Sequence, residues 1–377
     1  MAQISMHHWS RKLGAALLVL AAVAACTPAA SPTASPATSP AVSPADRYRV
    51  AAHVKVGVAD SDAATFESAD WPALKVRDAR AVAPWDVALQ ERDGGTPGGK
   101  RRLQLERWLE AAAHVGAQPV VTFELSAGRR DAPPTLEAYR HAMSKFRETY
   151  PKVMVLGAWN EPNDRGLASW VPDPALAAGY WATLQEVCRT CTVLAGEFAG
   201  IPGNAYVKEY VGHMRARETA RLSFPAVWSF HDHTDVNRFQ ANVDQSAPAA
   251  RYLLAALPAT ARVWITEAGA YYRNAKDEVF DEASHARAVS FLLGLTTLDA
   301  RIEAMFYYNF ANDCPSEPCP HQDRGLISPM PADGPQLDYD QRARRRCAFG
   351  VIAARGPYLL PAASRGEISR GGAAPAC

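Results

Sequence analysis

The sequence predicts an α/β fold, a single (β/α)8 TIM barrel in which eight parallel strands alternate with helices. From about residue 50 onward, eight short apolar runs recur, and amphipathic segments with helical spacing lie between most of them. We find neither an internal repeat nor a second domain in the 377 residues. A doubly wound open sheet is the alternative, but the segment 56–60 lacks the glycine-rich turn that usually follows an early strand of that fold.

The expected strands are β-branched or apolar runs, at 54–58, 76–82, 119–123, 153–159, 192–195, 226–230, 263–266 and 304–310. The expected helices carry apolar stripes, most clearly at 103–115, 139–150, 183–187, 252–257 and 286–298. In this fold the carboxyl ends of the strands meet at one face of the barrel, where the chemistry is placed.

The N-terminus has the pattern of a lipoprotein-type signal peptide over residues 1–26. Basic residues precede the apolar stretch 15–25, which is too short for a transmembrane helix, and Cys26 follows as in a bacterial lipobox. The sequence thus predicts lipidation of Cys26. An ordinary signal peptide cleaved near Ala25 is the alternative.

Residues 27–46 contain mainly Ser, Thr, Pro and Ala and no residue able to build a core, so we expect a disordered linker. The folded domain is expected at 47–360 and a C-terminal tail at 361–377. An anchor followed by a spacer predicts an extracytoplasmic protein that is lipid-anchored to a bacterial membrane. A secreted protein is the alternative.

Six further cysteines agree with export, because an oxidising compartment favours three disulfides. The candidates are Cys188, Cys191, Cys314, Cys319, Cys347 and Cys377. We expect pairing within the two close sets and between the last two cysteines. A redox motif at 188–191 and a zinc site made by four cysteines are the alternatives, but neither has its usual context or spacing.

The composition indicates a soluble globular protein, with 48% hydrophobic and 21% charged residues. The formal net charge is +1, so the sequence lacks the excess of positive charge that is typical of nucleic-acid-binding proteins. We therefore expect no nucleic-acid partner, and we expect a monomer.

Two expected strands end in a glutamate followed by turn-forming residues. Glu161 follows the fourth strand in Trp-Asn-Glu-Pro-Asn, and Glu267 follows the seventh in Trp-Ile-Thr-Glu-Ala-Gly. Carboxylates at these tips lie where a barrel places its chemistry. Cleavage of a glycosidic bond needs two such groups, a proton donor and a nucleophile or base.

The motif Asn160-Glu161-Pro162 together with Glu267 resembles the retaining glycoside hydrolases of the large (β/α)8 clan, which includes many cellulases, xylanases, β-mannanases and β-xylosidases. The resemblance spans the barrel. It implies that Glu161 is the general acid/base, that Glu267 is the nucleophile and that Asn160 binds the 2-hydroxyl of the sugar. It also implies double displacement on β-glycosidic bonds of an extracellular oligo- or polysaccharide, without a cofactor.

Within this clan the chain is most similar to exported actinobacterial glycosyl hydrolase-like lipoproteins. The segments Cys-x-x-Cys-Thr-Val, from Cys188, and Ser-Phe-His-Asp-His-Thr-Asp-Val-Asn-Arg-Phe, from Ser229, carry this narrower resemblance.

The sixth strand departs from the clan's pattern. His231 matches a histidine of the clan, but His233 stands where a tyrosine often hydrogen-bonds the nucleophile. A positively charged His233 is the expected substitute for that tyrosine. A metal site on His231 and His233 is the sharper alternative, although it would need further ligands at other strand ends.

The eighth strand departs too, because Tyr308 or Phe310 replaces the tryptophan that often forms the floor of the sugar site. Trp85, Trp170, Tyr271 and Tyr272 are candidate platforms for stacking on a sugar, although a single aromatic more often belongs to the core. Arg80 is expected either to hydrogen-bond Glu267 or to lie on the surface.

The sequence is also compatible with two other functions. One is a catalytically silent barrel that binds carbohydrate, because a fold does not guarantee turnover. The other is a metal-dependent hydrolase built on His231 and His233.

Overall fold

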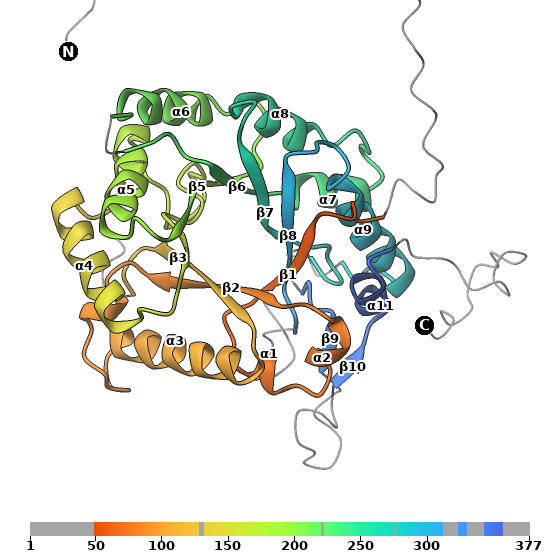
Figure 1. Cartoon of the computed structure of the whole chain (residues 1–377). Coiled ribbons are helices and arrows are strands. Elements are labelled where there is room, and N and C mark those ends of the chain that lie inside the picture. The colour runs from red at the N-terminus through yellow and green to blue at the C-terminus, as the bar shows by residue number, and fades with distance from the viewer. Residues whose placement is uncertain are drawn as a thin grey trace, which may run out of the picture. The chain divides into compact units, whose positions relative to one another are not determined.

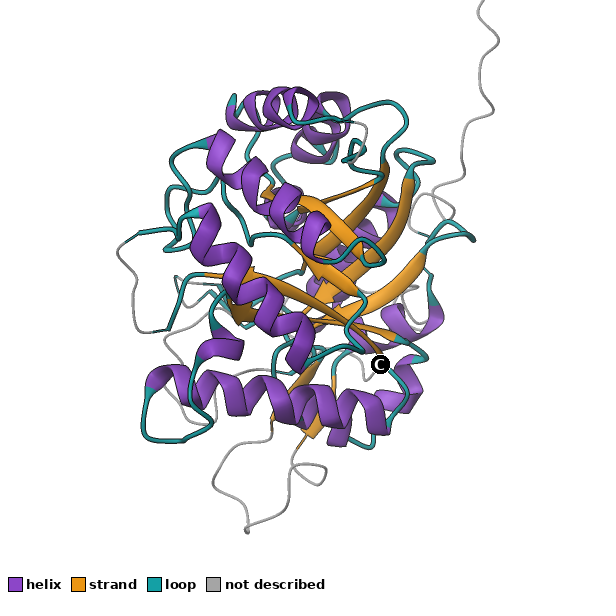
Figure 2. Ribbon diagram, turned by 60° about the vertical axis from the view of Figure 1, so that its left-hand side comes forward, coloured by secondary structure: helices purple, strands orange, loops and turns teal. Residues whose placement is uncertain are grey.

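The computed structural model describes residues 49–127, 132–219, 222–274, 276, 278–311, 323–329 and 343–356. Eight parallel strands close into a barrel in the order β1 to β8, with β8 paired back to β1. Helices surround this barrel (Figures 1 and 2). The prediction of a single (β/α)8 barrel is confirmed.

Each of the eight expected strands overlaps an observed one. The observed bounds are β1 (Lys55–Ala59), β2 (Asp78–Pro84), β3 (Gln118–Glu124), β4 (Val155–Gly157), β5 (Thr192–Ala199), β6 (Val227–His231), β7 (Arg262–Ala268) and β8 (Ile302–Tyr308). The largest difference is in β5, which continues four residues beyond the expected end at Ala195. Its extension carries a buried glutamate that belongs to the site.

The five expected helices correspond to α3 (Pro97–His114), α4 (Leu136–Thr149), α5 (Pro174–Val187), α8 (Pro248–Ala256) and α9 (Glu282–Leu295). Further elements are α1 (Ala64–Glu67), α2 (Trp71–Leu74), η2 (Val87–Leu89), α6 (Tyr206–Ala216), α7 (His233–Gln240) and α11 (Cys347–Ala354). A small antiparallel pair joins β9 (Ile327–Pro329) to β10 (Ala343–Arg345).

Several helices begin where the sequence supplies a side-chain cap. The side chains of Thr135, Asp173 and Asp281 accept hydrogen bonds from the first turns of α4, α5 and α9. Asp232 does the same for α7. His233 is therefore the first residue of a helix, and not part of the sixth strand.

Apolar side chains fill part of the interior of the barrel. One cluster there includes Val120, Leu194, Trp264 and Phe306, and the last two rings stack with centroids 6.1 Å apart. A larger apolar core lies between strands and helices and buries Trp108 and others completely. The polar groups described below lie at the carboxyl end of the strands, the face at which such barrels place their chemistry.

Cys188 and Cys191 form the expected disulfide between α5 and β5, with their Cα atoms 5.4 Å apart. Cys347 is also disulfide-bonded. Cys26, Cys314, Cys319 and Cys377 lie outside the described residues, as do the expected signal peptide, the linker and the tail.

No helix within the described ranges is long and apolar enough to cross a membrane.

Candidate active site

Glu161 and Glu267 both lie at the carboxyl end of the barrel. Glu161 follows β4, and Glu267 is the penultimate residue of β7. Their side chains are 12% and 15% exposed, so each is sheltered but open to solvent. The structure thus places both predicted catalytic residues at the mouth.

Arg80, on β2, joins the two strand tips. Its Nη1 donates to Glu267 Oε2 at 2.8 Å, and its Nη2 donates to Asn160 Oδ1 at 2.8 Å. The side chain is 1% exposed, so the surface alternative for Arg80 is wrong. Because the carbonyl of Asn160 accepts from Arg80, the orientation of the Asn160 amide is fixed.

His231, the last residue of β6, hydrogen-bonds to Glu161. Its Nδ1 donates to Glu161 Oε1 at 2.8 Å. Burial lowers the pKa of His231, but the charges of Glu267 and Glu161 and the hydrogen bonds to Glu161 and Glu197 together raise it to about 9. The ring is therefore an imidazolium at neutral pH. Its Nδ1 donates to Glu161, while its Nε2 lies 3.4 Å from Glu197 Oε2 and 3.3 Å from Arg80 Nη2.

His233 serves Glu267, as the sequence predicts, because its Nε2 lies 3.2 Å from Glu267 Oε1. Its charge differs from the expectation. Burial and the charge of Arg324 lower the pKa of His233 and outweigh its hydrogen bond to Glu267. His233 is thus a neutral donor through Nε2–H, and it is not the positive charge that holds Glu267 ionised.

The positive charges near Glu267 come from elsewhere. Burial raises the pKa of Glu267, but the charge of His231, the hydrogen bond from His233 and the charge of Arg80 together lower it below its usual range. Glu267 is therefore ionised at neutral pH, which is the state that a nucleophile requires.

Glu197 is a third carboxylate of this site, and we did not predict it. Its side chain is 0% exposed. Oε1 accepts from Ser229 Oγ at 3.1 Å, while Oε2 accepts from Arg80 Nη2 at 2.5 Å and from Thr122 Oγ1 at 3.1 Å. Burial raises the pKa of Glu197, but the charge of Arg80 and the contact with His231 outweigh burial and lower it to about 2.

A break in the strand register positions Glu197. Gly196 pairs with Ser229 and Phe198 with Phe230, so Glu197 is the extra residue of a bulge in β5. Its φ of 51° is left-handed, as is the φ of 45° at Glu161. The signal was present in the sequence, because Glu197 also follows a buried apolar run. The expected strand ended at Ala195, so Glu197 lay beyond it.

Tyr308 and Phe310 have different environments. The ring of Tyr308, the last residue of β8, lies edge-on to His233 with centroids 5.7 Å apart. Phe310 is fully buried and contacts Trp71 in the core, with centroids 6.2 Å apart. Of the two candidates for the floor of the site, Phe310 is therefore wrong, and Tyr308 borders the Glu267 side.

The tyrosine pair after β7 packs against cations. The guanidinium of Arg324 lies 3.6 Å from the ring centroid of Tyr271, and that of Arg346 lies 3.8 Å from that of Tyr272. One face of each ring is therefore covered by arginine, which leaves at most one face for a sugar.

The two predicted tryptophan platforms are half-buried. Trp85 follows β2 directly, donates its backbone N–H to Glu124 and packs against the core. Trp170 lies under the guanidinium of Arg165, 5.6 Å from its ring centroid.

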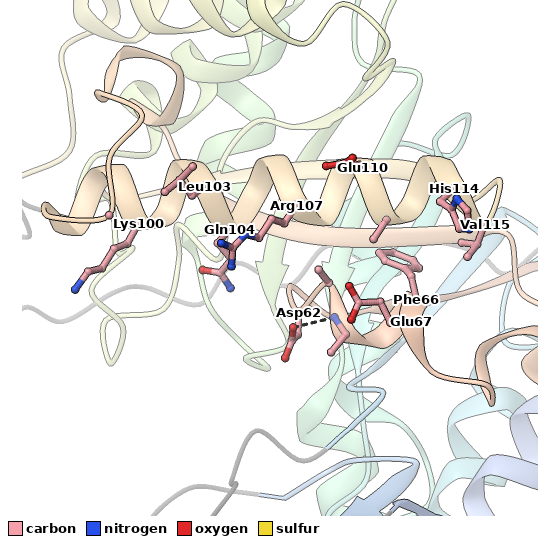
Figure 3. Close-up of a pocket in the computed structure, with 14 residues that line it drawn as sticks. Asp62, Phe66, Glu67, Lys100, Leu103, Gln104, Arg107, Glu110, His114 and Val115 are labelled. Atoms are coloured by element: carbon pink, nitrogen blue, oxygen red, sulfur yellow. Dashed lines mark hydrogen bonds between the residues drawn. The ribbon is translucent and has the colours of Figure 1, made fainter. Parts of the chain in front are cut away.

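A pocket of about 650 Å³ reaches Asn160 from the ends of β2 and β3. Its lining includes Pro84, Arg101, Glu124, Ser126, Asn160 and Ser169. A second pocket, of about 760 Å³, lies on the flank of the barrel and is lined by neither Glu161 nor Glu267. Figure 3 shows that α3 lines one side of it and Asp62, Phe66 and Glu67 the other.

The two histidines do not share a partner. His231 contacts Glu161 and Glu197, whereas His233 contacts Glu267. Within the described ranges, no group of three or more His, Cys, Asp or Glu residues is arranged to hold a metal ion.

No protein-family model matches the chain, and no curated protein matches it either. Similar solved structures exist. One is a family 39 glycoside hydrolase from Bacteroides cellulosilyticus, with a TM-score of 0.54 and 16% identity over 82% of this chain and 64% of that chain. The chain thus spans less than two thirds of that protein.

Two further structures are similar at low identity. A monomeric β-xylosidase from Caulobacter crescentus has a TM-score of 0.54 and 16% identity, covering 81% of this chain and 69% of that chain. A psychrophilic family 10 endo-β-1,4-xylanase has a TM-score of 0.52 and 10% identity, covering 80% of this chain and 96% of that chain. The chain therefore has the (β/α)8 fold that these glycoside hydrolases share.

Proposed function

We propose that this protein is a retaining glycoside hydrolase that cleaves β-glycosidic bonds of an extracellular oligo- or polysaccharide. One observation carries the proposal: two partly exposed glutamates at the tips of β4 and β7 have separate partners suited to different roles. The shared fold of the similar glycoside hydrolases supports it, since active sites of such barrels lie at this face.

In the first step Glu267 attacks the anomeric carbon, while Glu161 gives its proton to the leaving oxygen and the glycosidic bond breaks. In the second step Glu161 takes a proton from water, and the resulting hydroxide displaces Glu267 from the sugar. Both glutamates return to their starting states. No cofactor takes part in this sequence.

The partners of each glutamate suit its step. Glu267 carries its charge beside Arg80 and His233, so its attack requires no prior loss of a proton. Glu161 is bonded to His231 at Oε1, which leaves Oε2 as the oxygen that would pass the proton to the leaving group and take it from water. When that proton leaves, the imidazolium stabilises the new carboxylate.

The substrate would lie over Asn160 and Tyr308. The Asn160 carbonyl is held by Arg80, so its NH2 group is the donor for a sugar hydroxyl. Tyr308 borders Glu267 through His233, and an aromatic ring suits the C–H face of a pyranose.

We also propose that the protein works as a monomer on the outer side of a bacterial membrane, anchored through lipidated Cys26. The apolar stretch before Cys26 and the spacer after it support this proposal. Incorporation of labelled fatty acid into the natural protein, and its loss in Cys26→Ala, is the expected result. Equal labelling of both would contradict the anchor.

The decisive experiment is a panel of aryl β-glycosides and polysaccharides, tested with the natural protein and with Glu267→Ala. We expect the variant to lose at least about 10³-fold in kcat. Azide should restore aryl-glycoside turnover and give a glycosyl azide of inverted anomeric configuration, because azide replaces the missing nucleophile. Activity that persists unchanged in the variant would contradict the nucleophile assignment.

The same panel separates the silent-barrel alternative. Glycan binding without hydrolysis at any pH from about 4 to about 8 would favour a binding protein over an enzyme. The stereochemistry of the first product, followed by NMR, tests retention itself. A product of opposite anomeric configuration would overturn double displacement.

A further inference from the structure

The buried Glu197 is the part of this site that the proposed reaction does not use. It is 0% exposed, whereas Glu161 and Glu267 are 12% and 15% exposed. Both of its carboxylate oxygens accept hydrogen bonds from protein groups. Glu197 therefore cannot reach a sugar, and any role must act through its neighbours.

Those neighbours are Arg80 and His231, two cations of the site. Glu197 Oε2 lies 2.5 Å from Arg80 Nη2 and 3.4 Å from His231 Nε2. Arg80 is bonded to Glu267, and His231 is bonded to Glu161. The single buried carboxylate of Glu197 thus contacts both cations, the one that is bonded to Glu267 and the one that is bonded to Glu161.

The charged and titratable groups around His231 come from four strands and one helix. Glu161 lies after β4, Glu197 on β5, Glu267 on β7 and Arg80 on β2, while His233 of α7 contacts Glu267. Three carboxylates therefore surround one guanidinium and one imidazole. Without Glu197, His231 would face Arg80 with only the two glutamates that must change state during the reaction.

The backbone ties Glu197 to Glu161 by a second route. Glu161 N donates to the Glu197 carbonyl at 3.0 Å. The Glu197 N–H donates to Ser229 Oγ at 3.1 Å, so the bulge is held from both sides. A non-glycine residue stays in the left-handed region only where its surroundings compensate the cost, and such residues cluster at functional sites.

We propose that Glu197 is a positioning residue whose buried carboxylate keeps His231 protonated and holds Arg80 against Glu267. The imidazolium then donates to Glu161 through the whole cycle, while the guanidinium stays aligned on the nucleophile. This inference rests on the proposed function for its kinetic consequence, but the protonation of His231 is measurable without any substrate.

The test is the variant Glu197→Gln, which keeps the shape and removes the charge. NMR titration of protein labelled with 15N in histidine, with His231 assigned by its loss in His231→Asn, reports the protonation of His231. An opposite charge this close shifts a pKa by about 1 to 3 units, so we expect His231 to titrate at least about one pH unit lower in Glu197→Gln. An unchanged titration would overturn the proposal.

Glu303→Gln is the matched control. Glu303, near the start of β8, pairs with Arg262, the first residue of β7. This pair lies at the end of the barrel opposite to the site, so the same chemical change should leave the pKa of His231 unaltered. If Glu197→Gln does not fold, Glu197→Asp replaces it. Its charge is withdrawn by one methylene, and it should lower the pKa of His231 by a smaller amount. No shift in Glu197→Asp would then overturn the proposal.

Kinetics supply the second readout once a substrate is known. Because Glu197 does not touch the sugar, Glu197→Gln should lower kcat at least about tenfold and change KM less than about twofold. A raised KM with unchanged kcat would contradict a positioning role. If the natural protein has no glycosidase activity, the proposed function fails, while the titration of His231 still decides the inference.

Discussion

Arg80 and Glu267 are 187 residues apart in sequence, yet a hydrogen bond of 2.8 Å joins them at the mouth of the barrel. The same guanidinium bonds to Asn160 and Glu197. Only a planar fork of donors serves three acceptors in different directions, and lysine offers a single charged point on a flexible stem. The reach of Arg80 across the barrel therefore makes it the central cation of the site.

Arg80→Lys should consequently fold less stably and lose activity despite keeping its charge. We expect kcat to fall about 10²-fold or more, since Glu267 and Asn160 lose their fixed partner. The free energy of unfolding, measured with urea, should drop by roughly 3 kcal/mol or more, because buried acceptors are left unpaired. Arg262→Lys, which changes an exposed arginine, is the control. A variant with natural kcat would contradict the central role of Arg80.

The depressed pKa of Glu197 makes stability depend on pH in the acid range. The pKa falls from an ordinary 4.5 to about 2 on folding, so the ionised form is favoured in the folded state. The resulting stability is fully present above about pH 4.5 and is lost as the pH falls through about 2. It amounts to the order of 3 kcal/mol.

Thermal unfolding of the natural protein and of Glu197→Gln, compared across the acid range, checks this prediction. The glutamine cannot titrate, so the difference in melting temperature between the two proteins should shrink as the pH falls. A difference that stays constant between about pH 6 and about pH 2 would show that Glu197 does not supply this pH dependence.

His231 should act in the opposite direction at alkaline pH. Its pKa rises from an ordinary 6.5 to about 9 on folding, so the protonated form is favoured in the folded state. The stability that it contributes is fully present below about pH 6.5 and is lost as the pH rises through about 9. Urea unfolding of the natural protein and of His231→Asn over this window should converge at the alkaline end. Parallel curves would contradict a protonated His231.

How far the sequence alone reaches is clear from β4, β5 and β7. The apolar runs predict strands β4 and β7, and the glutamates that follow or end them predict the site residues Glu161 and Glu267. In both places an apolar run typical of a buried strand leads directly to a carboxylate. In β5 the residue before Glu197 is a glycine, which is common in turns, whereas in the structure the strand continues past it through a bulge. Contacts over long sequence separations decide that outcome, and no local pattern encodes them.

The histidines show the same limit. The resemblance to the glycoside hydrolase clan predicts that His233 approaches Glu267, and the structure confirms the contact. Its charge state depends on burial and on Arg324, which is distant in sequence. Charges of groups that meet only after folding are therefore beyond a reading of the sequence.

Gly157, the last residue of β4, tests how closely the site is packed. A Cβ atom added at Gly157 would collide with the side chain of Thr122, which bonds both Arg80 and Glu197. Gly157→Ala should therefore displace Thr122, lower the free energy of unfolding by about 1 to 3 kcal/mol and reduce kcat. An alanine Cβ at Gly212 in α6 meets no atom within 4 Å beyond the backbone of its own helix, and alanine favours the helix, so Gly212→Ala is the control. Urea unfolding and aryl-glycoside assays measure both effects, and equal behaviour of the two variants would show that the contact with Thr122 does not matter.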